Sequence, residues 1–392
     1  MTVASRLAPF GTTIFAEMTK LAAAHGAVNL AQGFPDFDGP EVAKVAAIEA
    51  IGAGHNQYAR MIGHPELAAA IAGSWHRRTG LELDADAELT VTAGCTEAIA
   101  AVMLGLVNPG DEVVLFQPFY DSYRACIAMA GGVARFVTLR PEGDTFTFDP
   151  HELERAFTGR TRLLLLNTPH NPTGKVFSRE EMLIIASLAI KHGVTVVTDE
   201  VYEDLTYDPR ASHVHLAALP GMRERTITLS SLGKSHSLTG WKVGWAIAPS
   251  AWTAGIRAAH QFLTFAVATP MQLGAAAAIR HGQPEVARVR DSFRANRDRL
   301  TACLERLGFR PYRSDGTYFI MASFAGEVAE RLKVESDREL CHTLTTRFGV
   351  AAIPPSVFYD DPGEGRWMVR FAYCKRPETI DAAIVKLAGI AR

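Results

Sequence analysis

The sequence predicts an α/β fold in which a large domain contains a mostly parallel, seven-stranded sheet. Apolar runs of strand length alternate with helical stretches through the middle of the chain, a pattern typical of this fold class. Several runs, such as Leu163–Leu166, are apolar without interruption, as expected for strands buried on both faces. Polar and glycine-containing segments follow these runs, at the carboxyl ends where parallel sheets bind ligands.

The predicted elements follow one another in a regular order. Strands are expected at Leu89–Ala93, Glu112–Gln117, Ala134–Leu139, Arg162–Asn167, Val194–Thr198, Thr226–Leu229 and Val243–Ala248. Helical stretches such as Thr96–Val107 and Arg179–Lys191 separate most of these strands. A long helical region is expected to follow the sheet, over Pro270–Leu307.

A change of pattern near the carboxyl terminus predicts a smaller α+β domain to which both termini contribute. Strands are expected at Thr317–Ser323 and Val369–Tyr373, followed by a closing helix from Pro377. A chain of 392 residues has room for two such lobes. We expect an N-terminal arm and part of the small domain over residues 1–40, a large ligand-binding domain over 41–290, and a small C-terminal domain over 291–392. The chain contains no flexible linker, so the lobes are expected to pack together.

Composition and charge argue against several classes of protein. Lysine and arginine total 40 against 42 for aspartate and glutamate, so no strong field favours nucleic acid or an anionic membrane. No apolar run approaches the ~20 residues of a membrane span, and no secretion signal is visible. The five cysteines are widely spaced without a C-x-x-C pair. This spacing indicates a reduced, cytoplasmic protein without disulfides or a cysteine zinc site.

Lys234 is the most informative single residue. It follows the apolar run Thr226–Leu229 and lies between Gly233 and Ser235. A lysine amine held partly neutral by its surroundings is a nucleophile for carbonyl groups. A phosphate loop of the form G-x-x-x-x-G-K-[ST] is excluded, because it needs glycine where the chain has Thr228. Taken alone, Lys234 fits a solvated loop lysine equally well.

Two further segments place polar side chains at strand ends. Asp199 closes the run Val194–Thr198, and a carboxylate there needs a cation such as a protonated ring nitrogen. A helix N-cap is the commoner role for such an aspartate. Asn171 lies in the turn Asn167–Gly174, which two prolines and a glycine make rigid enough to aim a donor at a ligand. An ordinary Asn-Pro turn is the alternative.

Three weaker signals accompany these residues. Gly94-Cys95-Thr96 opens a helix directly after a strand, where free N–H groups and the helix dipole suit a phosphate. Tyr120 follows another strand and suits stacking on a planar ligand, although a core aromatic is commoner. Arg370 alternates with apolar neighbours and suits a bidentate carboxylate clamp, although an exposed strand arginine fits the local pattern as well.

Other catalytic patterns are missing from the sequence. The histidines show no H-E-x-x-H or other metal-ligand spacing, so no metal is expected, and no G-x-S-x-G nucleophile motif is present. No G-x-G-x-x-G follows the first strand, which argues against a nicotinamide dehydrogenase. His76, His192 and His260 are interpreted as ordinary residues on helix surfaces.

Together these residues resemble one family, the pyridoxal-phosphate-dependent aminotransferases of fold type I, class I/II. The resemblance covers nearly the whole chain, from the segment Gly11–Phe15 to the final helix, with the motifs in family order. The branch that it resembles most contains methionine-preferring and kynurenine aminotransferases. Three segments carry this likeness: Gln32-Gly33-Phe34-Pro35-Asp36-Phe37, Asn56-Gln57-Tyr58 and Leu238-Thr239-Gly240-Trp241-Lys242-Val243-Gly244-Trp245.

The resemblance implies roles for the residues around the cofactor ring. Lys234 matches the lysine that links covalently to pyridoxal 5′-phosphate and carries the proton between the substrate α-carbon and the cofactor. Asp199 matches the partner of the ring nitrogen, which keeps the ring an electron sink. Asn171 and Tyr202 match the donors to the ring 3-oxygen, and Tyr120 matches the stacking aromatic. Lys234, Asp199 and Tyr202 are thus the expected catalytic residues.

The resemblance also implies a phosphate site and a substrate site. The phosphate is expected to bind Gly94, Cys95, Thr96, Ser231 and Lys242. Tyr58 matches a tyrosine that reaches the phosphate from a neighbouring subunit, which implies a homodimer with shared active sites. Arg370 matches the clamp on the substrate α-carboxylate, and Gly33, Phe34 and Asn171 are expected to contact the substrate.

The expected reaction is a ping-pong transamination between an L-amino acid and a 2-oxo acid. Ala266 stands where kynurenine enzymes carry a polar or histidine residue, which favours apolar donors such as methionine or phenylalanine. A β-lyase acting on cystathionine or cysteine conjugates needs the same lysine, aspartate and arginine and stays an alternative. A non-catalytic sensor domain is a second one, but such regulators carry a DNA-binding extension, and here the family-like region fills the chain.

Overall fold

The computed structural model describes residues 3–391 and consists of a large α/β lobe joined to a smaller α+β lobe. The large lobe is built on a seven-stranded sheet. Its strands run in the order β4 (Val133–Thr138), β3 (Glu112–Gln117), β7 (Thr161–Asn167), β8 (Thr195–Asp199), β9 (Thr226–Ser231), β10 (Gly244–Ile247) and β2 (Leu89–Thr92). The pairs from β4 to β9 are parallel, and only β10 runs antiparallel to its two neighbours. The predicted mostly parallel sheet is therefore confirmed.

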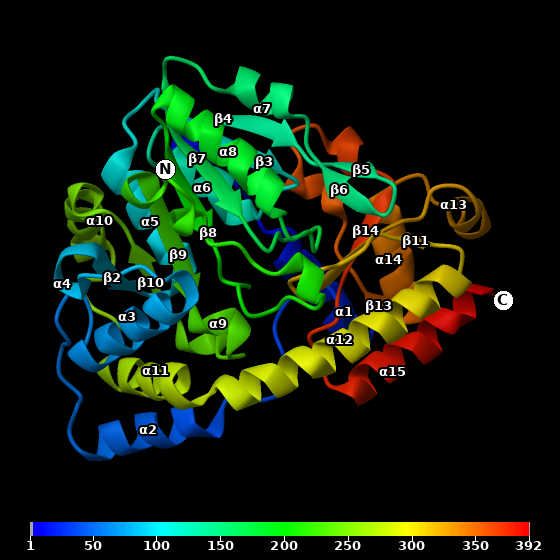
Figure 1. Ribbon diagram of the computed structural model, residues 1–392. Helices are drawn as coiled ribbons and strands as arrows, with labels where there is room; N and C mark the ends of the chain where they lie inside the picture. Colours follow the sequence, from blue (N-terminus) through cyan, green and yellow to red (C-terminus); the bar gives the residue numbers. More distant parts are fainter. Residues whose placement is uncertain (1–2, 392) are drawn as a thin grey trace.

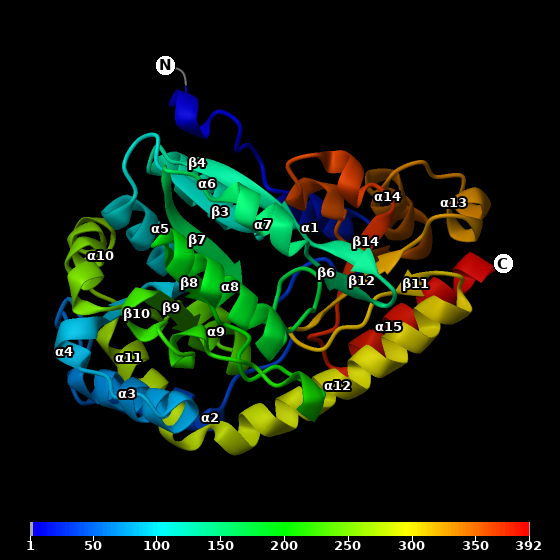
Figure 2. The ribbon, with the colours of Figure 1, turned by 45° about the horizontal axis from the view of Figure 1, so that its top comes forward.

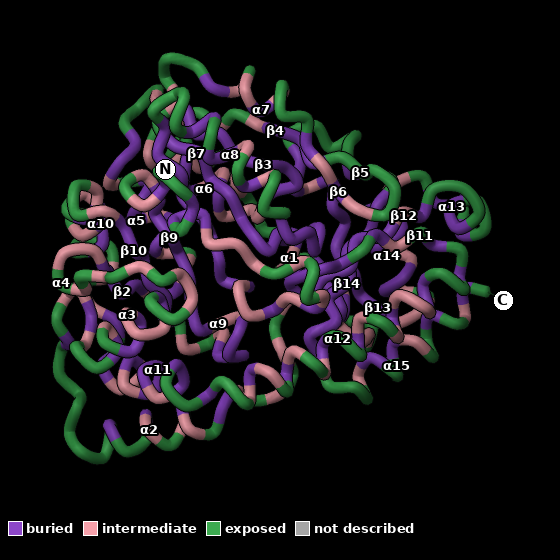
Figure 3. The backbone as a smooth tube through the Cα atoms, in the orientation of Figure 1, coloured by how far each residue is buried: buried purple, intermediate pink, exposed green. Residues whose placement is uncertain are grey.

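Helices cover both faces of this sheet, which explains its uninterrupted apolar strands. One face packs against α5 (Gly94–Leu106), α6 (Asp121–Met129) and α10 (Ser250–Leu263). The other face packs against α7 (Pro150–Ala156) and α8 (Arg179–His192). Figure 2 shows α7 and α8 lying together over the β3, β7 and β8 strands, and Figure 3 shows the buried backbone running through the centre of this layer. Alternate side chains of β3, β7 and β8 therefore enter two separate cores.

A third group of helices encloses the β2–β10 edge. It comprises α2 (Glu41–Gly52), α3 (Pro65–Thr79) and α11 (Thr269–His281), with the short helix α4 (Ala85–Glu88) beside them. The expected helical region 270–307 is two helices, because α11 ends at His281 and α12 (Gln283–Arg306) begins after Gly282. A side chain at Gly282 would approach Ala278 O to 2.5 Å, and Pro284 starts the new helix, which suits its missing N–H.

The smaller lobe combines segments from both ends of the chain. Its sheets are β11 (Arg310–Pro311), β12 (Phe319–Ser323) and β14 (Met368–Ala372), and the pair β1 (Val28–Asn29) with β13 (Val350–Ala351). Helices α1 (Ile14–Ala24), α13 (Glu327–Leu332), α14 (Asp337–Phe348) and α15 (Pro377–Leu387) complete it. A single apolar core joins residues 14–31 to residues 300–390.

Helix α12 connects the two lobes. Figure 1 shows it running from α11 to the far end of the smaller lobe, where it lies beside α15. The expected boundary between residues 290 and 291 falls inside this continuous helix, so that division stays a prediction. A hairpin of β5 (Arg140–Glu142) and β6 (Thr145–Thr147) also approaches the smaller lobe, where Phe146 stacks edge-on against Tyr312. Within residues 3–391, no helix has both the length and the apolar character that crossing a membrane requires.

Candidate active site

A cavity of about 150 Å³ lies at the edge of the sheet where the parallel strands end. Segments following β2, β3, β7, β8 and β9 line it, together with the residues that precede the antiparallel β10. Ten residues predicted from the sequence line this cavity: Gly94, Cys95, Thr96, Tyr120, Asn171, Asp199, Tyr202, Ser231, Lys234 and Lys242. The structure thus brings together side chains that are separated by up to about 150 positions in the chain.

Lys234 lies on the single-turn helix α9 (Leu232–Ser235), directly after β9. Burial lowers the pKa of its amine, and Lys242 acts in the same direction, while Cys374 and Asp199 partly oppose the shift. A larger neutral fraction makes an amine a better nucleophile and a better proton acceptor. The amine is therefore suited to carbonyl chemistry.

Asp199 ends β8 at the floor of the cavity. Its Oδ2 accepts a hydrogen bond of 2.7 Å from the Tyr123 hydroxyl, and its Oδ1 accepts one of 3.3 Å from the Val201 N–H. Burial raises the pKa of this carboxyl, and the hydrogen bonds from Tyr123, Val201 and Cys95, with the charge of Lys234, oppose that shift. In residues 3–391, Asp199 forms no salt bridge with a lysine or arginine. The site therefore holds a buried carboxylate with no cation in contact.

Tyr123 belongs to the site although the sequence interpretation missed it. It lies three residues after Tyr120 on α6, so both rings project toward the same region and pack edge-on at 5.6 Å between centroids. The spacing of the two tyrosines was the available signal. Its contact with Asp199 joins residues that lie 76 positions apart, which a local pattern cannot reveal.

The amino end of α5 meets Lys242 on one side of the cavity. Gly94 has a φ of +77°, and a side chain there would lie 3.0 Å from Lys242 Nζ. Gly244 allows β10 to approach the same helix start, because a Cβ at that position would lie 2.7 Å from Cys95 N. Among the described residues, no side chain caps the first turn of α5. Free N–H groups, a helix dipole and an ammonium make this corner suited to an anion.

Arg370 comes from β14 of the smaller lobe and is only 1% exposed. Its Nη1 donates to Asn171 Oδ1 at 2.9 Å, and its Nη2 donates to Ala31 O at 3.0 Å. Burial lowers the pKa of the guanidinium to about 10. Its Nε has no hydrogen-bond partner among the described residues. The exposed strand arginine that local pattern allowed is therefore wrong, and the group is a buried cation without an anion.

Aromatic rings surround the Arg370 guanidinium. Phe319 lies 4.1 Å from its central carbon, and Phe15 and Phe358 each lie 5.3 Å away. Rings at these distances stabilise a cation and shield it from water. An anion that reaches the guanidinium would enter an apolar pocket.

The remaining predicted substrate and partner residues lie outside the cavity lining. Gly33 O accepts a 2.6 Å hydrogen bond from the Tyr318 hydroxyl, whose ring packs against Tyr202. Phe34 is 43% exposed and covers the Lys375 ammonium at 4.4 Å. Tyr58 is 84% exposed and does not line the cavity of its own chain.

One histidine differs from the sequence interpretation. His260 is fully buried, and its Nδ1 contacts Glu97 Oε1 at 2.6 Å while its Nε2 contacts Met61 O at 3.0 Å. The prediction of a helix-surface position is therefore wrong, since His260 lies on the buried face of α10 with Thr253 and Ile256. The partners lie far away in the sequence, so only the fold reveals this role.

Comparisons with known proteins agree with this geometry. A family model described as aminotransferase class I and II matches residues 26–387. The chain is 48% identical to a probable N-succinyldiaminopimelate aminotransferase, DapC, of Mycobacterium tuberculosis, over 100% of this chain and 99% of the relative. It is 40% identical to a kynurenine–oxoglutarate transaminase of Dictyostelium discoideum, with 95% and 93% covered. The solved structure of Escherichia coli YbdL, described as having a methionine aminotransferase function, superposes with a TM-score of 0.93 at 39% identity, covering 99% of this chain and 100% of that one.

The chain therefore belongs to the class I and II aminotransferase family and has the fold type I architecture. Members of this family use pyridoxal 5′-phosphate as their cofactor, so the protein is a pyridoxal-phosphate-dependent aminotransferase. The names of the relatives include three different amino donors, and they agree on the type of reaction.

Proposed function

We propose that the cavity binds pyridoxal 5′-phosphate: Tyr120 and Val201 would contact its ring, the amino end of α5 would hold its phosphate, and Lys234 would react with its aldehyde. The observation that carries the proposal is the convergence of these groups in one cavity. Ser231, Lys242 and the residues Gly94 to Thr96 supply the donors and positive charge that a phosphate needs.

The buried charges of the site support this fit. Asp199 has no cationic partner of its own, and a protonated ring nitrogen would supply one. Asn171 Oδ1 already accepts from Arg370, which leaves its Nδ2 free to donate to the ring 3-oxygen. Tyr202 offers a second donor, since burial holds the pKa of its hydroxyl well above the usual range and keeps it protonated.

Arg370 would bind the α-carboxylate of the amino acid. The two charges would neutralise each other in an apolar pocket, where a bidentate ion pair is strong and directional. Fixing the carboxylate also fixes the α-C–H bond relative to the ring plane, which selects loss of the proton over loss of carbon dioxide.

The chain's own residues then carry the proton. When bound, the cofactor supplies an electron sink for the α-carbon of the amino acid. Lys234 Nζ accepts the α-proton, since burial lowers the pKa of its amine and enlarges the neutral fraction, and it returns the proton on the cofactor side. Burial holds the pKa of Tyr202 well above its usual range, so its hydroxyl stays protonated. A 2-oxo acid leaves and a second one enters, which makes the kinetics ping-pong.

Among donors, we propose methionine or an aromatic amino acid. The rings of Phe15, Phe319 and Phe358 make the approach to Arg370 apolar. A single-turnover screen of the twenty amino acids, followed by the visible absorbance of the holoenzyme, tests this preference. Methionine, phenylalanine and tyrosine are expected to react fastest, and a preference for aspartate would contradict it.

A β-lyase would use the same residues, so products must separate the two reactions. Incubation with a cysteine conjugate is expected to release little pyruvate and ammonia, while methionine with a 2-oxo acid is expected to yield the new oxo acid. A reversed result would favour the lyase.

Exposed aromatic side chains support a proposed homodimer, and unpaired cysteines support a proposed cytoplasmic location. Tyr58 and Phe262 are 84% and 85% exposed, and Tyr58 packs edge-on against Phe265 at 5.3 Å. We propose that a second copy covers this surface and that Tyr58 completes the neighbouring site in a homodimer. All five cysteines are unpaired, which fits the proposed cytoplasmic setting.

A further inference from the structure

A buried polar network lies behind the cofactor cavity, on the same backbone that lines it. Glu200 directly follows Asp199, Glu203 directly follows Tyr202, and Ser230 directly precedes Ser231. Asp199, Tyr202 and Ser231 line the cavity, whereas their three neighbours do not. Each of these three proposed cofactor contacts thus has a polar neighbour whose side chain lies outside the cavity lining.

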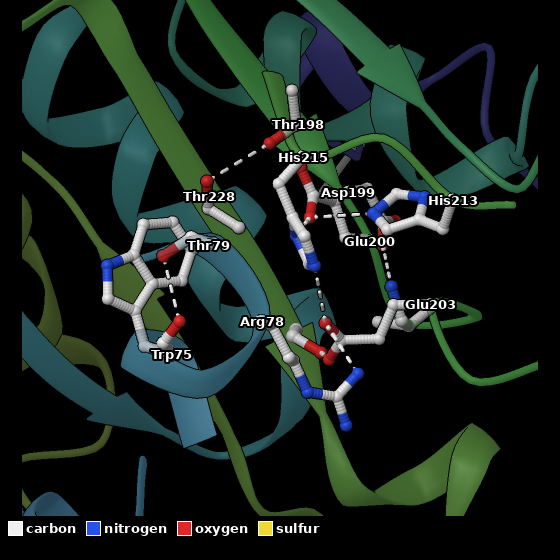
Figure 4. Close-up of polar contacts among 12 residues, drawn as sticks. Trp75, Arg78, Thr79, Thr198, Asp199, Glu200, Glu203, His213, His215 and Thr228 are labelled. Carbon is white, nitrogen blue, oxygen red and sulfur yellow. Dashed lines mark hydrogen bonds and ion pairs between the residues drawn. The ribbon is translucent and has the colours of Figure 1, made fainter. Parts of the chain in front are cut away.

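Two histidines from the segment between Asp208 and Leu216 connect this network, as Figure 4 shows. Glu200 Oε2 lies 2.9 Å from His213 Nε2 and 2.6 Å from His215 Nδ1. The other nitrogen of His215 lies 3.9 Å from Glu203 Oε2. His215 is therefore the side chain that connects the two glutamates.

Glu203 has two further contacts that reach neighbouring elements. Its Oε1 accepts a hydrogen bond of 2.9 Å from the Ser230 hydroxyl on β9. Its Oε2 lies 3.3 Å from Arg78 Nη1 on α3, and Arg78 also pairs with Asp204 at 2.8 Å. The network therefore ties β8, β9 and α3 together directly behind the site.

A glutamate between two histidines is also a donor set that a divalent cation accepts. The spacing argues for hydrogen bonds instead. Tetrahedral zinc ligands at about 2.0–2.1 Å from the metal lie roughly 3.3 Å from one another. The separations of 2.6 and 2.9 Å are shorter than this and match charge-assisted hydrogen bonds.

The charges around His215 favour its protonated form. Glu200 is fully buried, and an uncompensated carboxylate in that position is costly. Burial lowers the pKa of His215, but Glu200 and then Glu203 more than offset this and raise the pKa above its usual value, with Arg78 opposing. The groups facing His215 are thus Glu200 and Glu203 from the turn after β8, Arg78 and the Trp75 ring from α3, and His213 from its own segment.

We propose that His215 is a positioning residue for the aminotransferase reaction, because it contacts both Glu200 and Glu203 and so holds Asp199, Tyr202 and Ser231 against the cofactor. This inference rests on the cofactor contacts proposed above. Because folding raises the pKa of His215, its contribution is complete below the usual histidine pKa and is lost as the pH rises through the folded value. Cofactor retention should therefore weaken with rising pH.

The test measures the rate at which holoenzyme loses its cofactor in cofactor-free buffer, by visible absorbance, between pH 6 and 9. In the natural protein, release is expected to accelerate as the pH rises through the titration of His215. His215→Asn is expected to release cofactor about tenfold faster at the lower pH, a typical size for an outer-layer contact, with a flatter profile. His215→Lys keeps a positive charge and is expected to restore slow release across the range.

The matched control is His76→Asn, which removes a histidine from a surface pair with Glu82 at 3.1 Å on the same helix as Arg78. Its release profile is expected to match the natural protein. If His215→Asn and His215→Lys both give the natural profile, the inference is overturned. It is also overturned if the purified protein contains one equivalent of metal that Glu200→Gln removes. Loss of cofactor binding or transamination in the natural protein would instead overturn the proposed function.

Discussion

Arg370 shows how a single buried charge indicates a ligand. The guanidinium is enclosed by three rings and two oxygen acceptors, and none of these partners is an anion. Burial lowers its pKa to about 10, so it still carries its proton at neutral pH and remains uncompensated until an anion arrives. An α-carboxylate is the anion that every amino acid substrate brings.

We expect Arg370→Gln to reduce kcat/KM for all amino donors by a similar factor. Loss of a buried charge-assisted pair costs about 2–4 kcal/mol, which corresponds to roughly 30- to 1000-fold. Steady-state kinetics with two donors of different size measure the effect. Arg366→Gln is the control, because Arg366 lies over the Trp367 ring on the surface, and it should keep natural kinetics. If kcat/KM of Arg370→Gln fell by different factors for the two donors, Arg370 would instead contact the side chain of the donor.

Tyr123 gives a second prediction at this scale. Its hydroxyl donates to Asp199, which favours the ionised carboxylate, so Tyr123→Phe should raise the pKa of Asp199 further. A carboxyl group that is protonated more readily is less often the anion that pairs with the protonated ring nitrogen, and we expect kcat to fall by about tenfold, with its acidic limb moved to higher pH. The pH profile of kcat measures this.

Tyr359→Phe provides the matched control for Tyr123→Phe. The Tyr359 hydroxyl is buried without a hydrogen-bond partner in residues 3–391, so its removal should leave kcat and its pH profile unchanged. An acidic limb that stays in place in Tyr123→Phe would mean that Tyr123 only fills space.

At the residue scale, the sequence predicts candidate site residues where a polar side chain sits beside a clear strand end. Lys234, Asp199 and Asn171 all follow such ends, and the structure gathers them in one cavity. Tyr123 and His215 could not be found in this way, because their partners are distant in the sequence and their own neighbours carry no motif. The carboxylate role of Arg370 was predicted through the family resemblance of the chain, since the local alternation favoured an exposed arginine on a strand.

At the scale of elements, the close approach of β10 to the amino end of α5 forms the proposed phosphate site beside Lys242. Gly244 makes this approach possible, because a Cβ there would lie 2.6 Å from Gly94 C and 2.7 Å from Cys95 N. Both of these atoms belong to the backbone, so the clash can be removed only if the start of α5 moves. The N–H groups that face the anion would move with it.

We therefore expect Gly244→Ala to bind pyridoxal phosphate at least about tenfold more weakly, with a lower melting temperature, because a clash with backbone both strains the fold and displaces donors. Equilibrium titration by absorbance and thermal unfolding measure the two effects. Gly240→Ala is the control, since a side chain at Gly240 meets nothing within 4 Å. Equal affinity in the two variants would contradict the role assigned to this helix start.

Most elements could be predicted because their patterns are local. The expected strand Glu112–Gln117 has the observed bounds, and the other expected strands of the large sheet differ by no more than two residues at either end. The antiparallel direction of β10 was not predicted, because apolar content carries no information about direction. The break at Gly282 was also missed, since a glycine within a helical pattern does not reveal where the axis turns.

At the scale of the whole molecule, the exposed aromatic side chains predict a second subunit. Tyr58 and Phe262 expose most of their surface, and large exposed apolar groups gathered in one region indicate an interface. We expect light scattering to give a mass of about twice 42.5 kDa. Phe262→Asp should shift the mass toward the single chain and reduce cofactor retention, because Tyr58 would no longer reach its neighbour. A natural protein that is monomeric and fully active would exclude the shared site.

The central claim is that Lys234 is the residue to which the cofactor becomes attached. The most direct measurement is reduction of the holoenzyme with borohydride, proteolysis, and mass spectrometry of the modified peptide. The cofactor mass is expected on the peptide that contains Lys234, in about one equivalent per chain, and Lys234→Ala should show no attachment and no visible absorbance band. Attachment at Lys242 or Lys375, or full turnover by Lys234→Ala, would contradict the account.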